Sequence, residues 1–471
     1  MSLYLRLFRA LLAFGLIFAS YMIQLGLYRL TRRFQPDPEG GREVAHLPEW
    51  VRRRRRRVDA KNAKRLLRVM LRLRGVYIKL GQVLSIMGGF LPRVYSRELS
   101  VLQDRVPPHS FQAVRRVFRR SLGKRVDECF ERIDRTPIAA ASLGQVHAAW
   151  LPDGRKVAVK FLYPNIREVV VVDMRVIGLA VRVYKWFVPV ENLESVHGAL
   201  VDLLRRETDY LHEAACMERM AENFRDQEDL LFPGVVHELT TADILTMTYM
   251  EGFRITDVEQ MRARGIDPER VATRIVQSFY EQLFVHRFFH ADPHPGNFLV
   301  SEESTPADPR IVVLDFGAIS EVDDAMVEGM VDVLQGFFEQ DDALVLKGFE
   351  AMGFVAGEGN RALVEKTVLI YFRKLLNVKD RTAGALMRAK AHELESLADP
   401  EVERRELREL MRSIRYPDGW FYVERASVLA FWLVGQIAPD IDTLQVGFPY
   451  VLPLLAKRTM ERAARQAAEP G

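Results

Sequence analysis

Two short stretches, at residues 290–297 and 315–317, constrain this chain more than any other feature. The first reads HADPHPGN and the second reads DFG. Phosphoryl transfer uses an aspartate to orient the attacking group, and then an asparagine and another aspartate to hold metal ions on the nucleotide phosphates. Asp292, Asn297 and Asp315 have that order and spacing. The pattern predicts a nucleotide site in which Asp292 is catalytic and Asn297 and Asp315 bind Mg²⁺, a cation that prefers oxygen ligands.

The histidines of this region allow a rival interpretation. The apolar pattern of residues 271–289 predicts a helix, and helical spacing would align His286 with His290. Together with Asp292 and His294 they could form a zinc site. The prolines of the loop break any helix after Asp292, however, and no cysteine joins the group. Zinc is therefore a minor alternative to a magnesium-dependent nucleotide site.

An upstream segment supplies residues suited to holding a nucleotide. Residues 144–150, the turn at 152–155 and residues 157–160 read as strand, turn and strand. The second strand ends in VAVK, and kinases place such a lysine, here Lys160, on the α- and β-phosphates. The loop before the first strand has alanines where kinases have glycines, so altered nucleotide selectivity is expected. The expected nucleotide contacts are Ala139, Ala140, Ala141, Ser142, Gln145, Lys160, Thr248 and Met250.

Acidic residues follow on a segment, 199–224, that is expected to be one helix. Glu213 is the natural partner of Lys160 in the lysine–glutamate pair that kinases assemble. Asp209 lies one helical turn before Glu213 and would share its face. The alternative, surface acids on an amphipathic helix, would account for some of these residues. A strand over 244–252 is then expected to lead into a hinge between two lobes.

The segment 61–103 is expected to be helical, with a break near residues 88–89. Lys79 and Gln82 stand one turn apart beside an apolar stripe. Gly81 between them costs about 1 kcal/mol of helix propensity relative to alanine, yet it allows close approach of another backbone. By spacing alone, this is equally an ordinary amphipathic helix.

The N-terminal region is apolar and then strongly basic. Residues 10–28 are long enough to cross a membrane, and a cleaved signal peptide is the rival interpretation. The arginine run 52–57 predicts that the body of the chain lies on the cytoplasmic side. That run is expected either near anionic lipid headgroups or on a solvated linker or helix face. A net charge of +4 gives no reason to expect nucleic acid, and two cysteines are too few for a disulfide framework.

The part after Asp315 is expected to be helical, with a helix starting near Asp323 and loops near 357–359 and 417–419. No long segment for seating a peptide substrate is apparent, which argues against an ordinary protein kinase. Residues 427–438 are apolar but too short to span a membrane, so they are expected to be buried core.

Taken together, these motifs resemble the AarF/UbiB/ADCK family of atypical kinase-like proteins over about residues 60–455. The matching elements are KLGQ at 79–82, the alanine-rich loop at 139–142, VAVK at 157–160, ETD at 207–209, HADPHPGN at 290–297 and DFG at 315–317. The resemblance implies an α+β, bilobal protein-kinase-like fold with an N-terminal helical extension and a largely helical C-lobe. It also implies that the KLGQ helix covers the active site, which makes Lys79, Gln82, Glu207 and Asp209 regulatory. One departure is Thr248, where an acid is often found.

From these observations we expect a membrane-associated atypical kinase or ATPase that binds ATP and Mg²⁺ and, as the resemblance implies, supports ubiquinone or related isoprenoid-lipid biosynthesis. A small-molecule kinase of the aminoglycoside or choline type and a nucleotide-binding pseudokinase scaffold are the alternatives. Expected partners are anionic membrane lipid and enzymes of lipid biosynthesis. The expected segments are a membrane anchor (1–34), a basic linker (35–60), the helical extension (61–135), an N-lobe (136–252), a C-lobe (253–460) and a tail (461–471).

Overall fold

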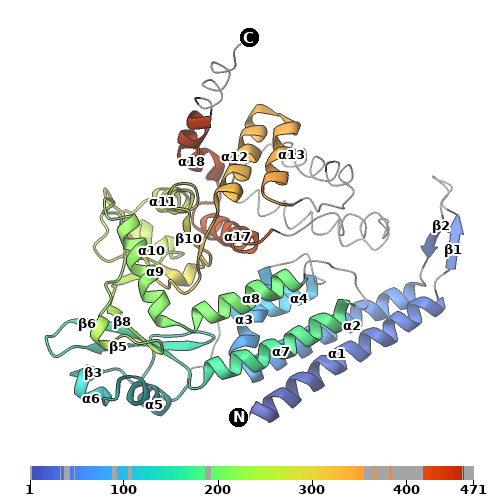
Figure 1. The fold of residues 1–471 in the computed structure, drawn as a ribbon, viewed down its shortest axis with the longest axis horizontal. Helices are drawn as coiled ribbons and strands as arrows, with labels where there is room; N and C mark the ends of the chain where they lie inside the picture. Colours follow the sequence, from blue (N-terminus) through green and yellow to red (C-terminus); the bar gives the residue numbers. More distant parts are fainter. Residues whose placement is uncertain are drawn as a thin grey trace, which may run out of the picture.

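The computed structural model describes residues 3–31, 33–36, 43–46, 48–86, 93–103, 109–185, 193–354 and 417–458, with the single residues 365, 382 and 460. The expected break at 88–89, the loop at 357–359 and the tail at 461–471 lie outside the described residues. The described chain combines sheets with a larger helical part, in agreement with a mixed helix-and-strand fold (Figure 1).

The first sheet is five-stranded and antiparallel, in the order β3-β5-β6-β8 with β4 paired to β5. Its strands are β3 (Arg132–Ile133), β4 (Ala139–Ala140), β5 (Gly144–Trp150), β6 (Lys156–Leu162) and β8 (Ile244–Thr248). The predicted strand–turn–strand over 144–160 is confirmed, and its register sets Val146 opposite Lys160. Helices α5 (Phe111–Leu122) and α6 (Val126–Cys129) pack on one face through Phe118 and Phe161, which leaves Lys160 on the other face.

The second sheet contains β7 (Leu230–Leu231), β12 (Ile311–Val313), β11 (Phe298–Ser301) and β9 (Gly252–Arg254), in that order. Beside it, β10 (Phe288–His290) pairs with β13 (Ile319–Glu321). The stretch 244–252, expected to be one strand, is divided: β8 belongs to the first sheet and β9 to the second. Residues 249–251 therefore carry the chain between the sheets, where a hinge was expected.

The remaining part is mainly helical. Its elements are α10 (Val258–Ala263), α11 (Pro268–Tyr280), the π-helix η3 (Glu281–Val285), α12 (Asp324–Glu339), α13 (Asp342–Ala351), α17 (Trp420–Ile437) and α18 (Thr443–Gly447). Asp323 caps α12, and α17 is buried, as predicted for residues 427–438. The prediction of one helix over 271–289 holds as far as Val285, through α11 and η3, and is wrong for residues 286–289. Arg287 has a φ of 53°, which turns the chain into β10, so His286 and His290 do not share a helical face.

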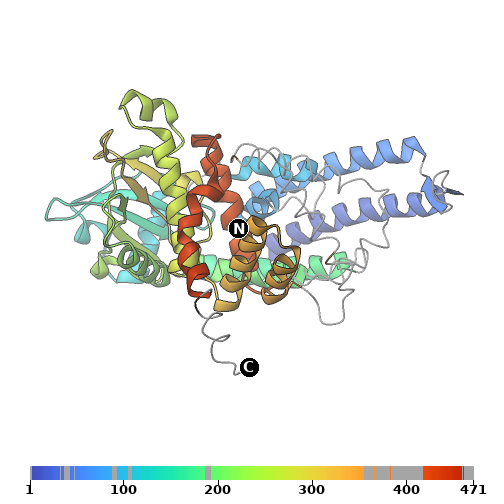
Figure 2. The same ribbon diagram turned by 90° about the horizontal axis from the view of Figure 1, so that it is seen from above.

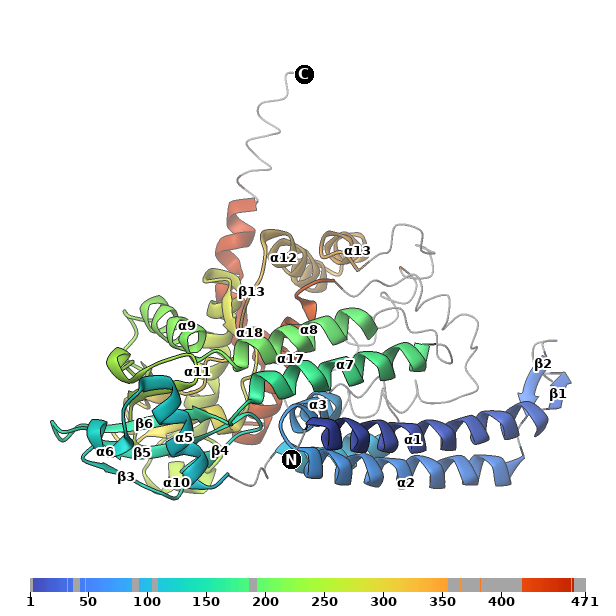
Figure 3. The ribbon, with the colours of Figure 1, turned by 60° about the horizontal axis from the view of Figure 1, so that its bottom comes forward.

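Helices also form the N-terminal part. They are α1 (Leu3–Thr31), α2 (Glu49–Leu73), α3 (Val76–Ile86) and α4 (Arg93–Leu99), with α7 (Ile166–Lys185) and α8 (Leu193–Glu207) beside them. Figures 1 and 3 show α1 and α2 as a long pair that reaches away from the sheets to the β1–β2 hairpin (33–36 and 43–46), and Figure 2 shows the same reach from above. The arginine run 52–57 lies within α2. Residues 49–60 are thus helix, and the expectation of a linker there is wrong.

Two predicted single helices are each divided in two. Between α2 and α3, Arg74 and Gly75 both have positive φ, 56° and 58°, so the chain cannot continue as one helix from residue 61. Between α8 and α9 (Tyr210–Asn223), Asp209 accepts hydrogen bonds from the N–H groups of Leu211 (3.2 Å) and His212 (3.4 Å). This is an N-cap, which starts a new helix at residue 210.

Candidate active site

Lys160 lies between two carboxylates. Its Nζ is 2.6 Å from Glu213 Oε1 and 3.2 Å from Asp315 Oδ1. The lysine comes from β6, the glutamate from the first turn of α9 and the aspartate from the turn after β12. The structure thus joins three distant segments at one buried ammonium, and the lysine–glutamate pair expected from the sequence is present.

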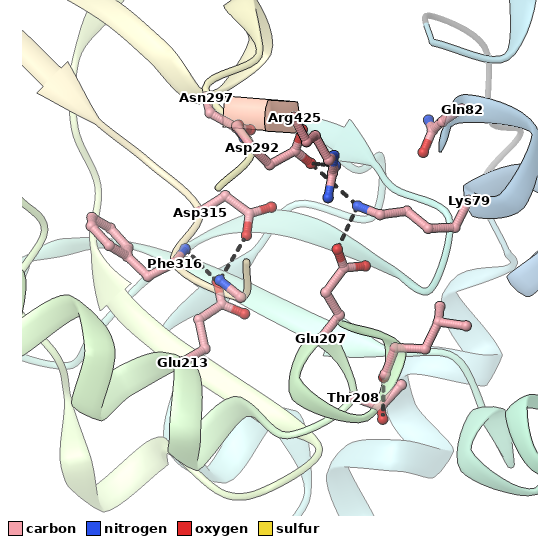
Figure 4. Close-up of polar contacts among 12 residues, drawn as sticks. Lys79, Gln82, Glu207, Thr208, Glu213, Asp292, Asn297, Asp315, Phe316 and Arg425 are labelled. Carbon is pink, nitrogen blue, oxygen red and sulfur yellow. Dashed lines mark hydrogen bonds and ion pairs between the residues drawn. The ribbon is translucent and has the colours of Figure 1, made fainter. Parts of the chain in front are cut away.

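Glu213 is the most enclosed member of this group, with 1% of its surface exposed. Its Oε1 also accepts a hydrogen bond from Phe316 N at 3.3 Å (Figure 4). Burial raises the pKa of Glu213 to about 7, although the Lys160 ammonium opposes that rise; the Asp315 carboxylate adds to it. Its Oε2 is buried and has no hydrogen-bond partner in the described part of the chain.

Asp315 has a strained backbone, because its φ of 58° is left-handed and it is not a glycine. Its Oδ1 accepts a hydrogen bond from Gly317 N at 3.2 Å. Burial would raise the pKa of Asp315, but the Lys160 and Lys79 ammonium groups and the hydrogen bond from Gly317 N together outweigh burial and lower that pKa below its usual value. The carboxylate therefore remains charged, as a ligand for a divalent cation must be.

The loop that carries Asp292 is held by its own side chains. Asn297 donates from Nδ2 to the Asp292 carbonyl oxygen at 2.9 Å, and His290 Nδ1 accepts from Asp292 N at 3.1 Å. Burial lowers the pKa of His290, in keeping with a neutral ring that accepts this bond. His294 likewise accepts from Gly296 N at 3.0 Å. Both histidines support the loop, and no cluster of three or more histidine, cysteine, aspartate or glutamate side chains suited to a metal exists within the described ranges.

The chemistry of Asn297 and Asp315 fits Mg²⁺. The Asn297 amide nitrogen is used by the loop, so Oδ1 is the atom of this side chain that could serve as an oxygen ligand. Asp315 Oδ1 is used by Lys160 and Gly317, which leaves Oδ2 for a cation. A neutral amide oxygen and a carboxylate oxygen are ligands of the type that Mg²⁺ takes together with nucleotide oxygens.

Lys79 reaches into this site from α3. Its Nζ forms an ion pair with Glu207 Oε1 and lies 3.2 Å from Asp292 Oδ2 (Figure 4). Burial would lower the pKa of Lys79, but the Glu207 and Asp292 carboxylates outweigh it and raise that pKa. Burial raises the pKa of Glu207 even though Lys79 opposes the rise. Lys79 thus occupies the position from which Asp292 would contact a substrate.

Arg425 is a second cation on the same aspartate, and sequence reasoning missed it. Its Nη2 is 2.7 Å from Asp292 Oδ2, and the residue is 5% exposed. Burial would raise the pKa of Asp292, but Arg425 and then Lys79 outweigh it and hold that pKa well below its usual range. The signal in the sequence was an arginine within the apolar run of α17, since buried arginines are rare unless paired.

Three predicted site residues are used elsewhere. Gln82 lies apart from the Lys79 cluster (Figure 4) and donates to the Leu102 carbonyl oxygen at 2.9 Å. Asp209 caps α9. Thr248 Oγ1 accepts from Gly234 N at 2.8 Å. These contacts are structural, so among the four residues expected to be regulatory, only Lys79 and Glu207 meet at Asp292.

Gln145 is also placed differently from the prediction. Strand side chains alternate between faces, and Gln145 pairs across the sheet with Phe161, whereas Val146 pairs with Lys160. Gln145 Oε1 accepts from His109 N at 2.8 Å, and its Nε2 lies 2.9 Å from His147 Nε2. The side chain therefore lies on the face opposite Lys160, and the prediction that it contacts nucleotide is wrong.

The alanine-rich loop is a short hairpin. Ala139 and Ala140 form β4, and Ala141 N donates to the Gly144 carbonyl oxygen at 2.8 Å. A Cβ on Gly144 would lie 2.6 Å from the Tyr210 hydroxyl, so only glycine fits there. The alanine-rich loop is therefore held by pairing between β4 and β5.

The site is of the protein-kinase type. It combines a strand lysine paired with a helix glutamate, the Asp292 loop and the DFG turn. The sequence places it in one branch of that class: residues 101–348 match the ABC1 atypical kinase-like domain, and the chain belongs to this family.

Curated relatives carry related names. The chain is 30% identical to Protein ACTIVITY OF BC1 COMPLEX KINASE 8, chloroplastic, of Arabidopsis thaliana, over 84% of this chain and 54% of the relative. It is 32% identical to Probable protein kinase UbiB of Aeromonas hydrophila, over 68% and 59%. It is 36% identical to AarF domain-containing protein kinase 1 of Xenopus laevis, over 55% and 50%. The chain thus spans about half the length of the curated relatives it matches.

Proposed function

We propose that this chain is an atypical kinase or ATPase that binds ATP with Mg²⁺ and is held in a closed state by two cations on its catalytic aspartate. The observation that carries the proposal is the placement of Asp292 between Lys79 and Arg425, beside a complete Lys160–Glu213–Asp315 group. The bilobal kinase arrangement, with residues 249–251 as the hinge, is part of this proposal.

The residues divide the chemistry as follows. Lys160, positioned by Glu213, holds the α- and β-phosphates, and the oxygens of Asn297 and Asp315 hold Mg²⁺, which neutralises charge on the phosphates when it is bound. Asp292 orients a hydroxyl group or water and accepts its proton. The bond between the γ-phosphorus and the bridging oxygen breaks, a bond to the attacking oxygen forms, and ADP leaves. Lys79 and Arg425 must release Asp292 before this can occur.

The resemblance to the AarF/UbiB/ADCK family supports a role in isoprenoid-lipid metabolism, such as ubiquinone or a related quinone, at a membrane. A nucleotide-binding scaffold without turnover is the second candidate, because Asp292 is fully engaged by cations in this state. A soluble small-molecule kinase is disfavoured by Lys79, which takes the space of the acceptor.

The test is ATP binding and hydrolysis by the purified full chain, with and without liposomes. Asp315→Asn is expected to abolish turnover, and Asp226→Asn, an equivalent change at an exposed aspartate, is expected to leave it unchanged. Unchanged turnover in Asp315→Asn would contradict the site assignment. ATP binding without turnover in the unaltered chain would instead favour the scaffold.

A further inference from the structure

The helix α1 is the one described helix that is long and apolar enough to cross a membrane. Two properties of a helix decide whether it crosses a bilayer or lies in its surface: what it contacts, and how its apolar side chains are distributed around it. Both properties of α1 can be read from its contacts with α2 and α7.

The inner face of α1 packs apolar side chains into the core and also carries polar side chains that are paired. Arg6 is buried, and its Nε and Nη2 lie 2.8 Å and 2.5 Å from the two carboxylate oxygens of Asp173 on α7. Tyr21 donates from its hydroxyl to Asp59 Oδ1 on α2 at 2.6 Å. Further along, Ser20 Oγ accepts from Asn62 Nδ2 at 2.7 Å. Hydrogen bonds and an ion pair thus fix α1 to α2 and α7 along most of its length.

The outer face of α1 is apolar and exposed. Large apolar side chains recur there at helical spacing, and the exposed ones are Tyr4, Leu5, Phe8, Leu11, Leu12, Leu16, Ile23 and Leu30. Phe8 is 62% exposed and Ile23 57% exposed. An exposed apolar stripe of this length marks a surface that is covered in use.

A membrane-spanning α1 is incompatible with these contacts. If α1 crossed the bilayer alone, Asp173 and Asp59 would lose their partners. If α2 followed it, the exposed cations of α2 would enter the hydrocarbon, where charged side chains are costly. Those cations are Arg52, Arg53, Arg55, Arg56, Arg57, Lys61, Lys64, Arg68 and Arg72.

The same cations indicate what covers the apolar stripe. They lie on α2, the helix packed beside α1 (Figure 3). Among the described residues, Glu49 and Asp59 form ion pairs with members of this basic set. A surface that is apolar on one helix and strongly basic on its neighbour complements a bilayer with anionic headgroups. A second copy of the same chain would bring like charges together.

We propose that α1 lies in the plane of an anionic bilayer, with its outer face in the acyl boundary and the α2 cations on the headgroups, and does not cross it. This deepens the membrane association included in the proposed function. It concerns how the helix meets the lipid and is independent of whether ATP is turned over.

Topology separates the two arrangements. Arg9→Cys and Arg29→Cys place thiols at exposed positions next to the two ends of the apolar run, outside the apolar stripe, and the native Cys129 and Cys216 are buried. Membranes from expressing bacteria are treated with a membrane-impermeant maleimide. An in-plane helix predicts that both positions are labelled in inside-out vesicles and neither in intact spheroplasts. Labelling of Arg9→Cys in spheroplasts, with Arg29→Cys labelled only in inside-out vesicles, would show a spanning helix and overturn the proposal.

Binding of the purified full chain to vesicles tests the stripe itself. The double variant Phe8→Glu with Leu12→Glu is expected to weaken flotation with phosphatidylglycerol vesicles at least tenfold, and Leu452→Glu, an exposed apolar residue elsewhere, is expected not to. The double variant Lys64→Glu with Arg68→Glu should also weaken vesicle binding, although it leaves the apolar stripe of α1 unchanged. This second pair keeps the test valid if the first double variant fails to fold. Unchanged flotation of both pairs, or a dimer that Phe8→Glu converts to monomer, would overturn the proposal.

Discussion

Lys79 and Arg425 both contact the carboxylate of Asp292, and Lys79 belongs to the helical extension. We predict that Lys79→Ala raises ATP hydrolysis or autophosphorylation several-fold, because it removes one of the two cations that must release Asp292. The same change leaves Glu207 buried without its ion-pair partner, which costs about 3–5 kcal/mol of stability. Steady-state turnover checks the first effect and chemical denaturation the second. The double variant Lys79→Ala with Glu207→Gln should recover stability while its turnover stays high. If turnover in Lys79→Ala is no higher than in the unaltered chain, the proposal that Lys79 restrains Asp292 is contradicted.

The arginine can be separated from the lysine by pH. The pKa of Asp292 is depressed, so its ion pairs contribute stability above the usual aspartate pKa and lose it only as pH falls through the depressed value. Arg425→Gln removes the largest lowering influence, and we expect the acidic limb of kcat/KM to move to higher pH. A pH–rate profile measures this shift. Arg219→Gln, which breaks an exposed pair with Glu321, is the control and should leave the limb in place.

At the scale of the element, α3 is positioned by a glycine. A Cβ on Gly81 would meet the buried Met70 side chain at 2.8 Å and would also overlap Leu102. We predict that Gly81→Ala destabilises the chain by about 1–3 kcal/mol, since neither core side chain can withdraw freely. Gly198→Ala on α8 is the matched control, because nothing lies within 4 Å of its added Cβ. Thermal unfolding compares the two, and equal melting temperatures would show that α3 tolerates displacement.

Elements were predictable from the sequence where the local pattern determines the structure. The hairpin ending in Lys160 follows from alternation and a turn, and Asp323 was found near a helix start because caps are local. The breaks at Arg74 and Asp209 were missed, since apolar periodicity continues through both. The same limit applies to the site. Motif spacing indicated Lys160, Glu213 and Asp315. The contact of Arg425 with Asp292 depends on tertiary packing, and the position of Gln145 on the sheet face opposite Lys160 depends on strand register.

At the scale of the whole molecule, one residue joins three helices. Besides Asp173, Arg6 donates from Nη1 to the Leu73 carbonyl oxygen and from Nη2 to that of Arg74 at 3.1 Å, where α2 ends. We predict that Arg6→Leu lowers the free energy of unfolding by about 3–5 kcal/mol, because it leaves Asp173 charged and buried. Urea denaturation measures this change. Arg72→Leu, exposed on α2, should cost well under 1 kcal/mol, and an equally small cost for Arg6→Leu would mean that α1 is not part of the folded body.

From the sequence, α1 was predicted to be a membrane anchor separate from the folded body. Composition shows how apolar a helix is, but it does not show which of its faces packs against the rest of the protein. Its polar residues looked like interruptions of an apolar run. In the structure Tyr21 and Gln24 are instead the residues that attach the helix to α2.

The Arg6–Asp173 pair also has a consequence for biosynthesis. The two residues are 167 positions apart, so at roughly 5–20 residues per second α1 emerges from the ribosome some 10–30 seconds before its partner on α7 exists. During that interval an apolar helix with an unpaired arginine is exposed. Newly made chains therefore need a holding surface, either a chaperone or a lipid leaflet, and depletion of that surface should cause aggregation of nascent chains before any loss of assembled protein.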